Sequence, residues 1–235
     1  MAYKKISADC RDVWNAFMVK GATFSESGIP FCPTTVKELP RQLISYTKAR
    51  EIYNRQIKRG NKSFTVDAFV HFYQHDYKFD GNRCGIWAAP QRAFEILRHF
   101  AGIITPDFST YADFPFPLKI YNTYRMRAFG YWYGTFGGAV INNVRWGEEE
   151  TFSYCFDSIP ENSIISIGTV ASGLRSSQNR ELFEGGFYKL LEVLTPHTII
   201  VYGSDNYSFF NKIRKYVQIL HFQSERALAF TEEKI

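Results

Sequence analysis

The sequence contains few cysteines, no long apolar run and none of the short motifs that mark common catalytic sites. Its 235 residues include four cysteines, no two of which are spaced as CxxC, so neither a disulfide framework nor a metal site is predicted. The apolar runs are far shorter than the ~20 residues that a membrane-spanning helix needs. The segment 1–7 is polar and is not expected to be a secretory signal. We therefore expect an intracellular protein with reduced thiols, no membrane partner and no cofactor.

Apolar residues make up 45% of the chain and aromatic residues 17%, which is enough to pack a core and excludes general disorder. The net charge is +5, but the basic residues are unevenly distributed. Residues 1–62 hold twelve of the 28 Lys and Arg residues and only five of the 23 Asp and Glu residues. This asymmetry indicates an acidic partner for that segment, either nucleic acid or an acidic protein surface.

Short β-branched runs alternate with helical patterns over the last two-thirds of the chain. This rhythm predicts an α/β fold with a mostly parallel sheet of about six strands. A regular eight-stranded barrel needs more strands, so a partial or atypical barrel and an open doubly wound sheet both stay open. The runs are 66–72, 102–107, 139–145, 163–169, 198–204 and 217–222.

The charge distribution and the strand pattern divide the chain into a basic helical N-terminal extension (1–62), an α/β core (63–222) and a tail (223–235). A helix is predicted over about 40–59, with Pro40 in its first turn and Gly60 after its end. Basic residues recur there every seven positions and are expected to share one helix face. This face is either simply solvated or a surface that follows nucleic-acid phosphates. The candidate nucleic-acid contacts are Arg41, Lys48, Arg55, Arg59 and Lys62.

Several predicted strands end in polar residues. Because the carboxyl ends of parallel strands gather ligands at one edge of a sheet, these residues are expected to form a pocket. Within it, the planar guanidinium of Arg145 matches a phosphate or a carboxylate. The alternative is that the polar residues only cap turns. The candidate ligand-binding residues are Asn143, Arg145, Thr169, Ser204 and, in a Gly/Ser-rich loop, Arg175; the candidate catalytic carboxylates are Asp76 and Asp107.

Five segments, taken in order, resemble an uncharacterised domain-of-unknown-function family common in bacteriophages, prophages and plasmids. They are GIITPDFS (102–109), IYNTYR (120–125), NNVRWG (142–147), CFDSIP (155–160) and IIVYGS (199–204). The resemblance covers about 65–222 and leaves the basic segment outside. It implies a mobile-element setting, and hence the cytoplasm of a bacterial host, but it implies no activity.

Three functions are weighed on these observations. The first is a mobile-element accessory protein that binds or acts on nucleic acid or a nucleotide, with Arg145 on phosphate and Asp107 and Asn143 on sugar or base. The second is a non-catalytic inhibitor of a host defence or replication protein, which uses aromatic side chains as interface anchors. The third is a hydrolase or lyase with Asp76 and Asp107 as paired carboxylates. Neither GxSxG, the P-loop nor GxGxxG is present, so whether the chain is an enzyme stays undecided.

Overall fold

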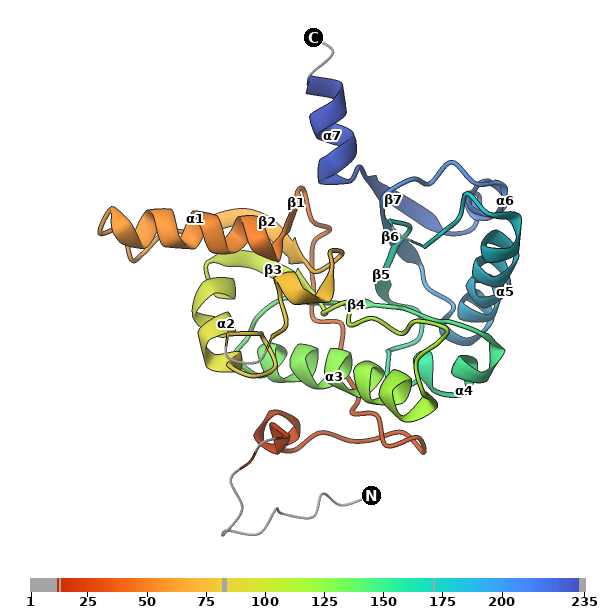
Figure 1. The fold of residues 1–235 in the computed structure, drawn as a ribbon, viewed down its shortest axis with the longest axis horizontal. Coiled ribbons are helices and arrows are strands. Elements are labelled where there is room, and N and C mark those ends of the chain that lie inside the picture. Colours follow the sequence, from red (N-terminus) through yellow and green to blue (C-terminus); the bar gives the residue numbers. More distant parts are fainter. Residues whose placement is uncertain (1–11, 13, 82–83, 171, 233–235) are drawn as a thin grey trace.

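Seven parallel strands pair in the order in which they occur along the chain, in a computed structural model that describes residues 12, 14–81, 84–170 and 172–232 (Figure 1). Because the order never reverses, every connection advances in the same direction, whereas a doubly wound sheet requires a reversal. The sheet curls strongly into a half-barrel, which decides between the two predicted alternatives. The strands are β1 (Leu43–Ser45), β2 (Val66–His71), β3 (Phe100–Ile104), β4 (Val140–Asn143), β5 (Ile164–Gly168), β6 (Thr198–Tyr202) and β7 (Gln218–Phe222).

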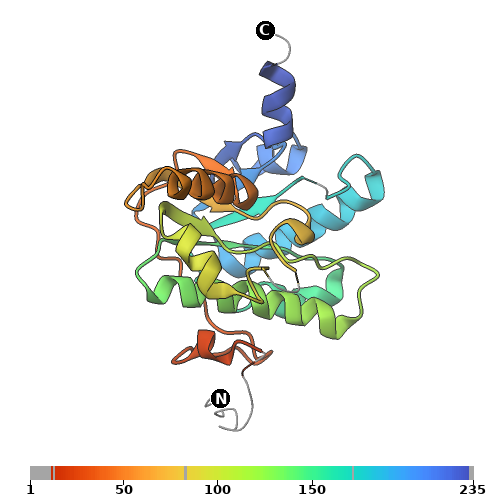
Figure 2. The ribbon, with the colours of Figure 1, turned by 60° about the vertical axis from the view of Figure 1, so that its left-hand side comes forward.

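The helices pack mainly against the outer, convex side of this sheet (Figures 1 and 2). None of the helices in the described part of the chain is long and apolar enough to cross a bilayer. The α-helices are α1 (Tyr46–Lys58), α2 (Pro90–Leu97), α3 (Phe116–Thr135), α4 (Phe152–Cys155), α5 (Ser177–Leu194), α6 (Ser208–Ile213) and α7 (Glu225–Glu232). The short 3-10 helices are η1 (Ala16–Val19), η2 (Asp76–Lys78) and η3 (Glu149–Thr151).

Side chains alternate between the two sides of the sheet, as the pleat of a strand requires. In β2, Val70 packs with the outer helices, whereas Phe69 joins a separate core inside the curl. The inner core holds Tyr73, just past β2, and Tyr202 from β6, whose rings stack with centroids 5.3 Å apart. Strands at opposite ends of the sheet therefore meet across its concave side, which shows how far the sheet curls.

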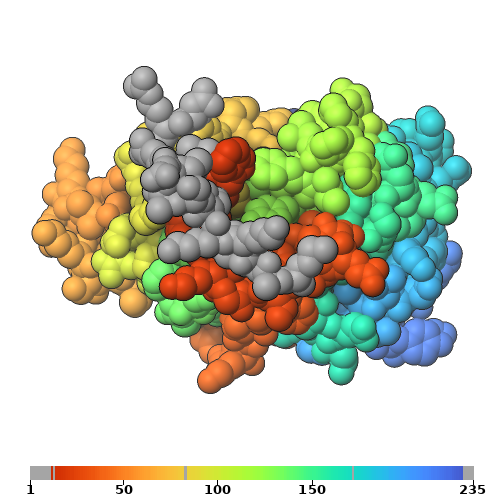
Figure 3. All heavy atoms as spheres, turned by 90° about the horizontal axis from the view of Figure 1, so that it is seen from below, coloured from red at the N-terminus to blue at the C-terminus, as the bar shows by residue number. Residues whose placement is uncertain are grey.

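The predicted N-terminal extension is not confirmed as a separate part. Residues 43–45 form β1, the edge strand that pairs with β2, so the helix predicted over 40–59 begins only at Tyr46. Ser45 caps this helix, because its Oγ accepts a hydrogen bond from Lys48 N at 3.3 Å. Cys32 is fully buried in the outer core. Figure 3 shows the preceding residues, in red and orange, lying across the face that carries α3.

The C-terminal segment begins at the gap between the two ends of the sheet. Ser45 N, on β1, donates to Glu225 Oε1 at 3.0 Å, and Glu225 N donates to the hydroxyl of Tyr202 at 3.1 Å. The first residue of α7 therefore contacts both β1 and β6. The predicted tail is helical over Glu225–Glu232, and residues 233–235 lie outside the described part.

Gly168, on β5, allows Tyr73 to cross the inner side of the sheet. A Cβ at this position would lie 2.6 Å from the Tyr73 ring, whereas a Cβ on Gly185, in α5, would meet nothing within 4 Å. We expect Gly168→Ala to lower the free energy of unfolding by roughly 1–3 kcal/mol. The matched Gly185→Ala should raise it by about 0.5–1 kcal/mol through helix propensity. Urea denaturation measures both, and a Gly168→Ala variant as stable as the wild type would contradict the inner packing of Tyr73.

His71, at the end of β2, is buried inside the curl and stacks on Tyr202 with centroids 4.1 Å apart. Its Nδ1 accepts a hydrogen bond from Tyr73 N at 3.2 Å, and burial lowers its pKa from 6.5 to about 3. The unfolded chain therefore binds a proton between these two pH values that the folded chain does not. Stability contributed by neutral His71 is complete above pH 6.5 and is lost as the pH falls.

We expect acid to destabilise the wild type more steeply than His71→Phe between pH 6 and pH 4. The difference in slope should approach ~1.4 kcal/mol per pH unit, the value for one proton. Denaturation at a series of pH values measures both slopes, so the carboxylates common to the two proteins cancel. Parallel slopes would show that His71 takes up its proton as readily in the folded state.

Candidate functional site

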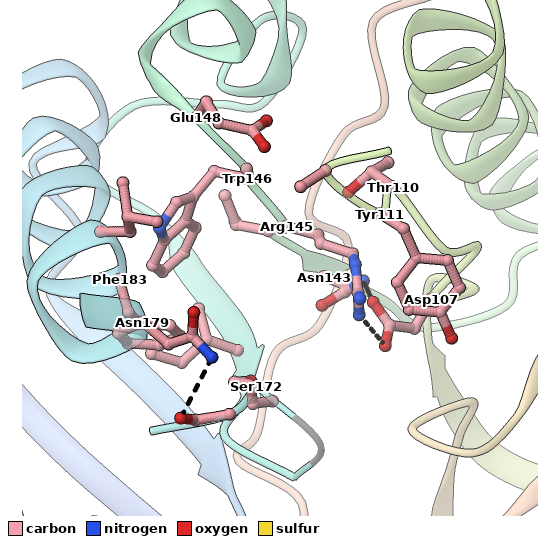
Figure 4. A pocket seen from close by; sticks show the side chains of 17 residues that line it. Asp107, Thr110, Tyr111, Asn143, Arg145, Trp146, Glu148, Ser172, Asn179 and Phe183 are labelled. Carbon is pink, nitrogen blue, oxygen red and sulfur yellow. Dashed lines mark hydrogen bonds and ion pairs between the residues drawn. The ribbon is translucent and has the colours of Figure 1, made fainter. Parts of the chain in front are cut away.

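A cavity of about 290 Å³ opens at the carboxyl ends of β3, β4 and β5, beside the first turns of α5 (Figure 4). This is the edge at which parallel folds place their ligands. Three residues predicted for the site line it, namely Asp107, Asn143 and Arg145. On the other side, Trp146 and Phe183 form an aromatic wall (Figure 4), with ring centroids 4.7 Å apart.

The loop that carries Asp107 is buried over its whole length. Residues 105–110 belong to no strand or helix, so their polar groups need partners outside a regular ladder. Thr105 Oγ1 accepts from Asn143 N at 2.8 Å. Ser109 donates through its N and its Oγ to the Asp76 carboxylate, at 3.0 and 2.7 Å, and its carbonyl accepts from Asn122 Nδ2. These bonds fix the loop before any ligand arrives.

Asp107 is held by both of its oxygens. Asn143 Nδ2 donates to Oδ1 at 2.9 Å, and Arg145 Nη1 donates to Oδ2 at 2.9 Å. Burial lowers the pKa of Arg145, but the adjacent Asp107 carboxylate outweighs that effect, so the pKa is raised and the guanidinium stays charged. The Arg145 side chain is 28% exposed, whereas that of Asp107 is 11% exposed. Arg145 thus presents a charged edge to the cavity while Asp107 supports it from below.

A second tier of polar groups orients Asn143 from inside the half-barrel. The Tyr73 hydroxyl donates to Asn143 Oδ1 at 3.0 Å and lies 2.7 Å from Ser166 Oγ. Since Oδ1 accepts from Tyr73 and Nδ2 donates to Asp107, one orientation of the amide satisfies both partners. Burial raises the pKa of Tyr73 well above its usual value, so the hydroxyl stays protonated.

Thr110 supplies an unused polar group at the cavity. Its side chain is 7% exposed, and its Oγ1 has no hydrogen-bond partner among the described residues. A buried hydroxyl without a partner costs free energy that a ligand hydrogen bond would recover. Thr110 lines the same cavity as Arg145, so a polar ligand there could satisfy it.

The rim of the cavity is fixed by a buried lysine on α3. Lys119 Nζ lies 3.1 Å from Glu148 and 3.0 Å from Glu150, and the lysine side chain is 3% exposed. Burial lowers its pKa, but the two carboxylates outweigh that effect and leave it raised, so Lys119 is charged. Glu148 also lines the cavity, and the ion pair holds it at the rim. No three His, Cys, Asp or Glu side chains in the described part of the chain form a metal-binding group.

The other predicted site residues lie outside this cavity. Asp76 does not line it and instead holds Ser109 in the neighbouring loop. Thr169 Oγ1 donates to the carbonyl of Ser204 at 2.8 Å, while the Ser204 hydroxyl accepts from Asn206 N in an exposed turn. Arg175 is exposed and is not a lining residue either.

Sequence reasoning missed Tyr73, Ser166, Thr110 and the aromatic wall. Tyr73 and Ser166 are 93 residues apart in the chain, and no local pattern links them. Trp146 directly follows Arg145 in the segment NNVRWG, so its position was visible, but its contact with Phe183 of α5 was not.

The five predicted nucleic-acid contacts are all exposed but do not share one helix. Lys48 and Arg55 lie on α1, and Arg59 directly follows it. Arg41 precedes β1 and lies 3.7 Å from Asp67, and Lys62 lies beyond the helix end. The seven-residue spacing therefore breaks at both ends, because β1 and the turn after α1 interrupt the helix.

The comparisons with known proteins agree with a phage-associated family of unknown function. The chain is 32% identical over 139 residues to the "Gene 1 protein" of Mycobacterium phage D29, covering 59% of this chain and 49% of that protein. It is 33% identical over 135 residues to the "Gene 1 protein" of Mycobacterium phage L5, covering 57% and 56%. The chain thus matches about half the length of these curated relatives. No solved structure matches it.

The family model described as "Domain of unknown function (DUF4417)" matches residues 22–223. This span includes β1 and α1, which the resemblance in the sequence left outside. It also includes every residue that lines the cavity at β3–β5. Since the match covers most of the sequence, the chain belongs to the DUF4417 family.

Proposed function

We propose that the chain binds a nucleotide, or a nucleotide unit of a nucleic acid, in the cavity at the ends of β3, β4 and β5. The observation that carries this proposal is the charged Arg145, held by Asp107 beside an aromatic wall. A nucleotide combines an aromatic base, polar hydroxyls and an anionic phosphate. Arg145 suits the phosphate or a base carbonyl, Trp146 suits the base, and Asp107 and Asn143 suit sugar or base hydrogen-bond donors and acceptors.

The cost of the buried loop supports a binding role rather than a packing role. Apolar side chains of similar volume would fill the mouth of the half-barrel at a lower cost in desolvation. The chain instead keeps Asp107, Asn143 and Arg145 there and fixes them through Tyr73 and Ser109. Side chains locked in this way lose little conformational entropy when a ligand binds.

A thermal-shift panel of nucleosides and of mono-, di- and triphosphates tests the cavity. A ligand at 100 times its Kd should stabilise the wild type by about 2.7 kcal/mol. Arg145→Met should abolish most of that stabilisation, because the methionine keeps the volume but loses the donors and the charge. Each variant is compared with its own ligand-free melting temperature, since Arg145→Met also leaves the Asp107 carboxylate without its cation.

Lys215→Met is the control for this panel, because Lys215 is exposed and does not line the cavity. It should keep the full ligand-induced shift. A shift that persists in Arg145→Met would contradict the assigned site. The absence of any shift at millimolar nucleotide would exclude a nucleotide ligand for this cavity.

The surface of α1 supports a nucleic-acid partner. Between residues 41 and 62 the chain carries seven Lys and Arg residues and one acidic residue, Glu51, and all eight are exposed. Such a surface binds phosphates without reading sequence, and its affinity falls with salt.

We expect salt-dependent binding of DNA or RNA that weakens in the triple variant Lys48→Ala, Arg55→Ala, Arg59→Ala. Each lost phosphate contact should reduce the slope of log K against log salt by roughly 0.7–0.9. Electrophoretic or anisotropy titrations at several salt concentrations measure this slope. Lack of binding to DNA and RNA at low salt would exclude the nucleic-acid partner. If neither ligand class binds, the inhibitor hypothesis predicts that Asp107→Ala and Arg145→Ala leave the biological effect intact.

A further inference from the structure

A groove of about 520 Å³ lies between α1 and α2, on the outside of the sheet (Figure 1). It shares no lining residue with the cavity at β3–β5. From α1 it is lined by Arg50, Tyr53 and Asn54, and from α2 by Gln91 and Arg92. Two arginines, two amides and one aromatic ring therefore meet in one recess on the basic side of the molecule.

The two arginines come from distant parts of the sequence but converge in space. Arg50 breaks the seven-residue spacing on α1, and Arg92 lies outside the basic N-terminal quarter. Both lie near the hydroxyl of Tyr46. Burial raises the pKa of that group to about 12, and the two guanidiniums oppose this rise. Arg92 Nη1 also donates to Cys84 Sγ at 3.3 Å.

The groove carries a net positive charge. Neither Arg50 nor Arg92 forms an ion pair with any carboxylate in the described part of the chain. One acidic residue, Glu95, lines the groove, and its carboxylate lies 3.0 Å from Arg98 Nε. The exposed basic residues of α1 extend the positive surface beyond the groove.

The shape and chemistry of this recess favour one strand over two. A duplex presents its phosphates on a convex surface with its bases stacked inside, so a recess between two helices meets few of them. A single strand exposes bases as well as phosphates, and proteins bind it through a basic groove with aromatic side chains. Asn54 and Gln91 offer both hydrogen-bond donors and acceptors to exposed base edges.

We propose that the groove between α1 and α2 binds single-stranded nucleic acid, with Arg50 and Arg92 on its phosphates and Tyr53, Asn54 and Gln91 facing its sugars and bases. This inference rests on the nucleic-acid part of the proposed function and specifies the partner as a single strand. The residues assigned here are different from those that the seven-residue spacing selected.

The test is fluorescence anisotropy with a labelled twelve-nucleotide oligothymidylate and a twelve-base-pair duplex at low salt. The double variant Arg50→Gln, Arg92→Gln should lose at least tenfold in affinity for the single strand. Its slope of log K against log salt should fall by about 1.4, the value for two single-strand phosphate contacts. The matched control is Lys212→Gln, Lys215→Gln, which removes the same charge from an exposed site near α6. All variants should melt with the wild type, since these side chains are exposed.

Three outcomes would overturn the groove assignment. Equal losses in the double variant and its control would reduce the effect to net charge. Tighter binding of the duplex would assign the other form of nucleic acid. Full displacement of the oligonucleotide by millimolar thymidine monophosphate would show a mononucleotide site.

The same titrations separate this inference from the proposed function. If the oligonucleotide binds and only the triple variant on α1 weakens it, the nucleic-acid partner stands and the groove does not. If no nucleic acid binds at low salt, both fail together, while the thermal-shift panel decides the nucleotide cavity independently.

Discussion

The curl of the parallel sheet is the constraint on which the rest of the structure depends. It brings Tyr73 beside Tyr202 on the concave side, although these residues follow β2 and end β6. A flat sheet would leave both rings in water. Because Tyr73 reaches across β5 over Gly168, its hydroxyl arrives at Asn143 and Ser166 and orients the floor of the cavity. The packing that bends the sheet thus also positions the polar site.

The cavity combines rigid support with unused hydrogen-bonding capacity. Asp107 has both oxygens engaged, and the loop around it is buried and tied to Asp76 and Asn122. Arg145 and Thr110, by contrast, keep donors that no described residue satisfies in full. Supporting groups that are fully paired, next to contacting groups that are not, form the arrangement expected of a binding site.

The two proposed sites differ in what they select. The cavity is small, contains an acidic and a basic side chain in contact, and suits one nucleotide-sized molecule. The groove between α1 and α2 is larger and positive, and it opens onto an exposed basic surface. Long-range attraction therefore belongs to the α1 side, whereas selection by shape and hydrogen bonding belongs to the ends of β3, β4 and β5.

The sequence by itself determined the α/β class and six of the seven strands, because β-branched runs and helical periodicity are local properties. It also placed Asp107, Asn143 and Arg145 at strand ends, and those ends met at one edge since the strands are parallel. It did not show β1, which has three residues and is defined by its pairing with β2. Thr169 and Ser204 also follow strands, yet they bond to each other outside the cavity. Only the tertiary structure decided the curl, the contact of Tyr73 with Asn143 and the meeting of Arg50 with Arg92, because each joins residues that no local pattern relates.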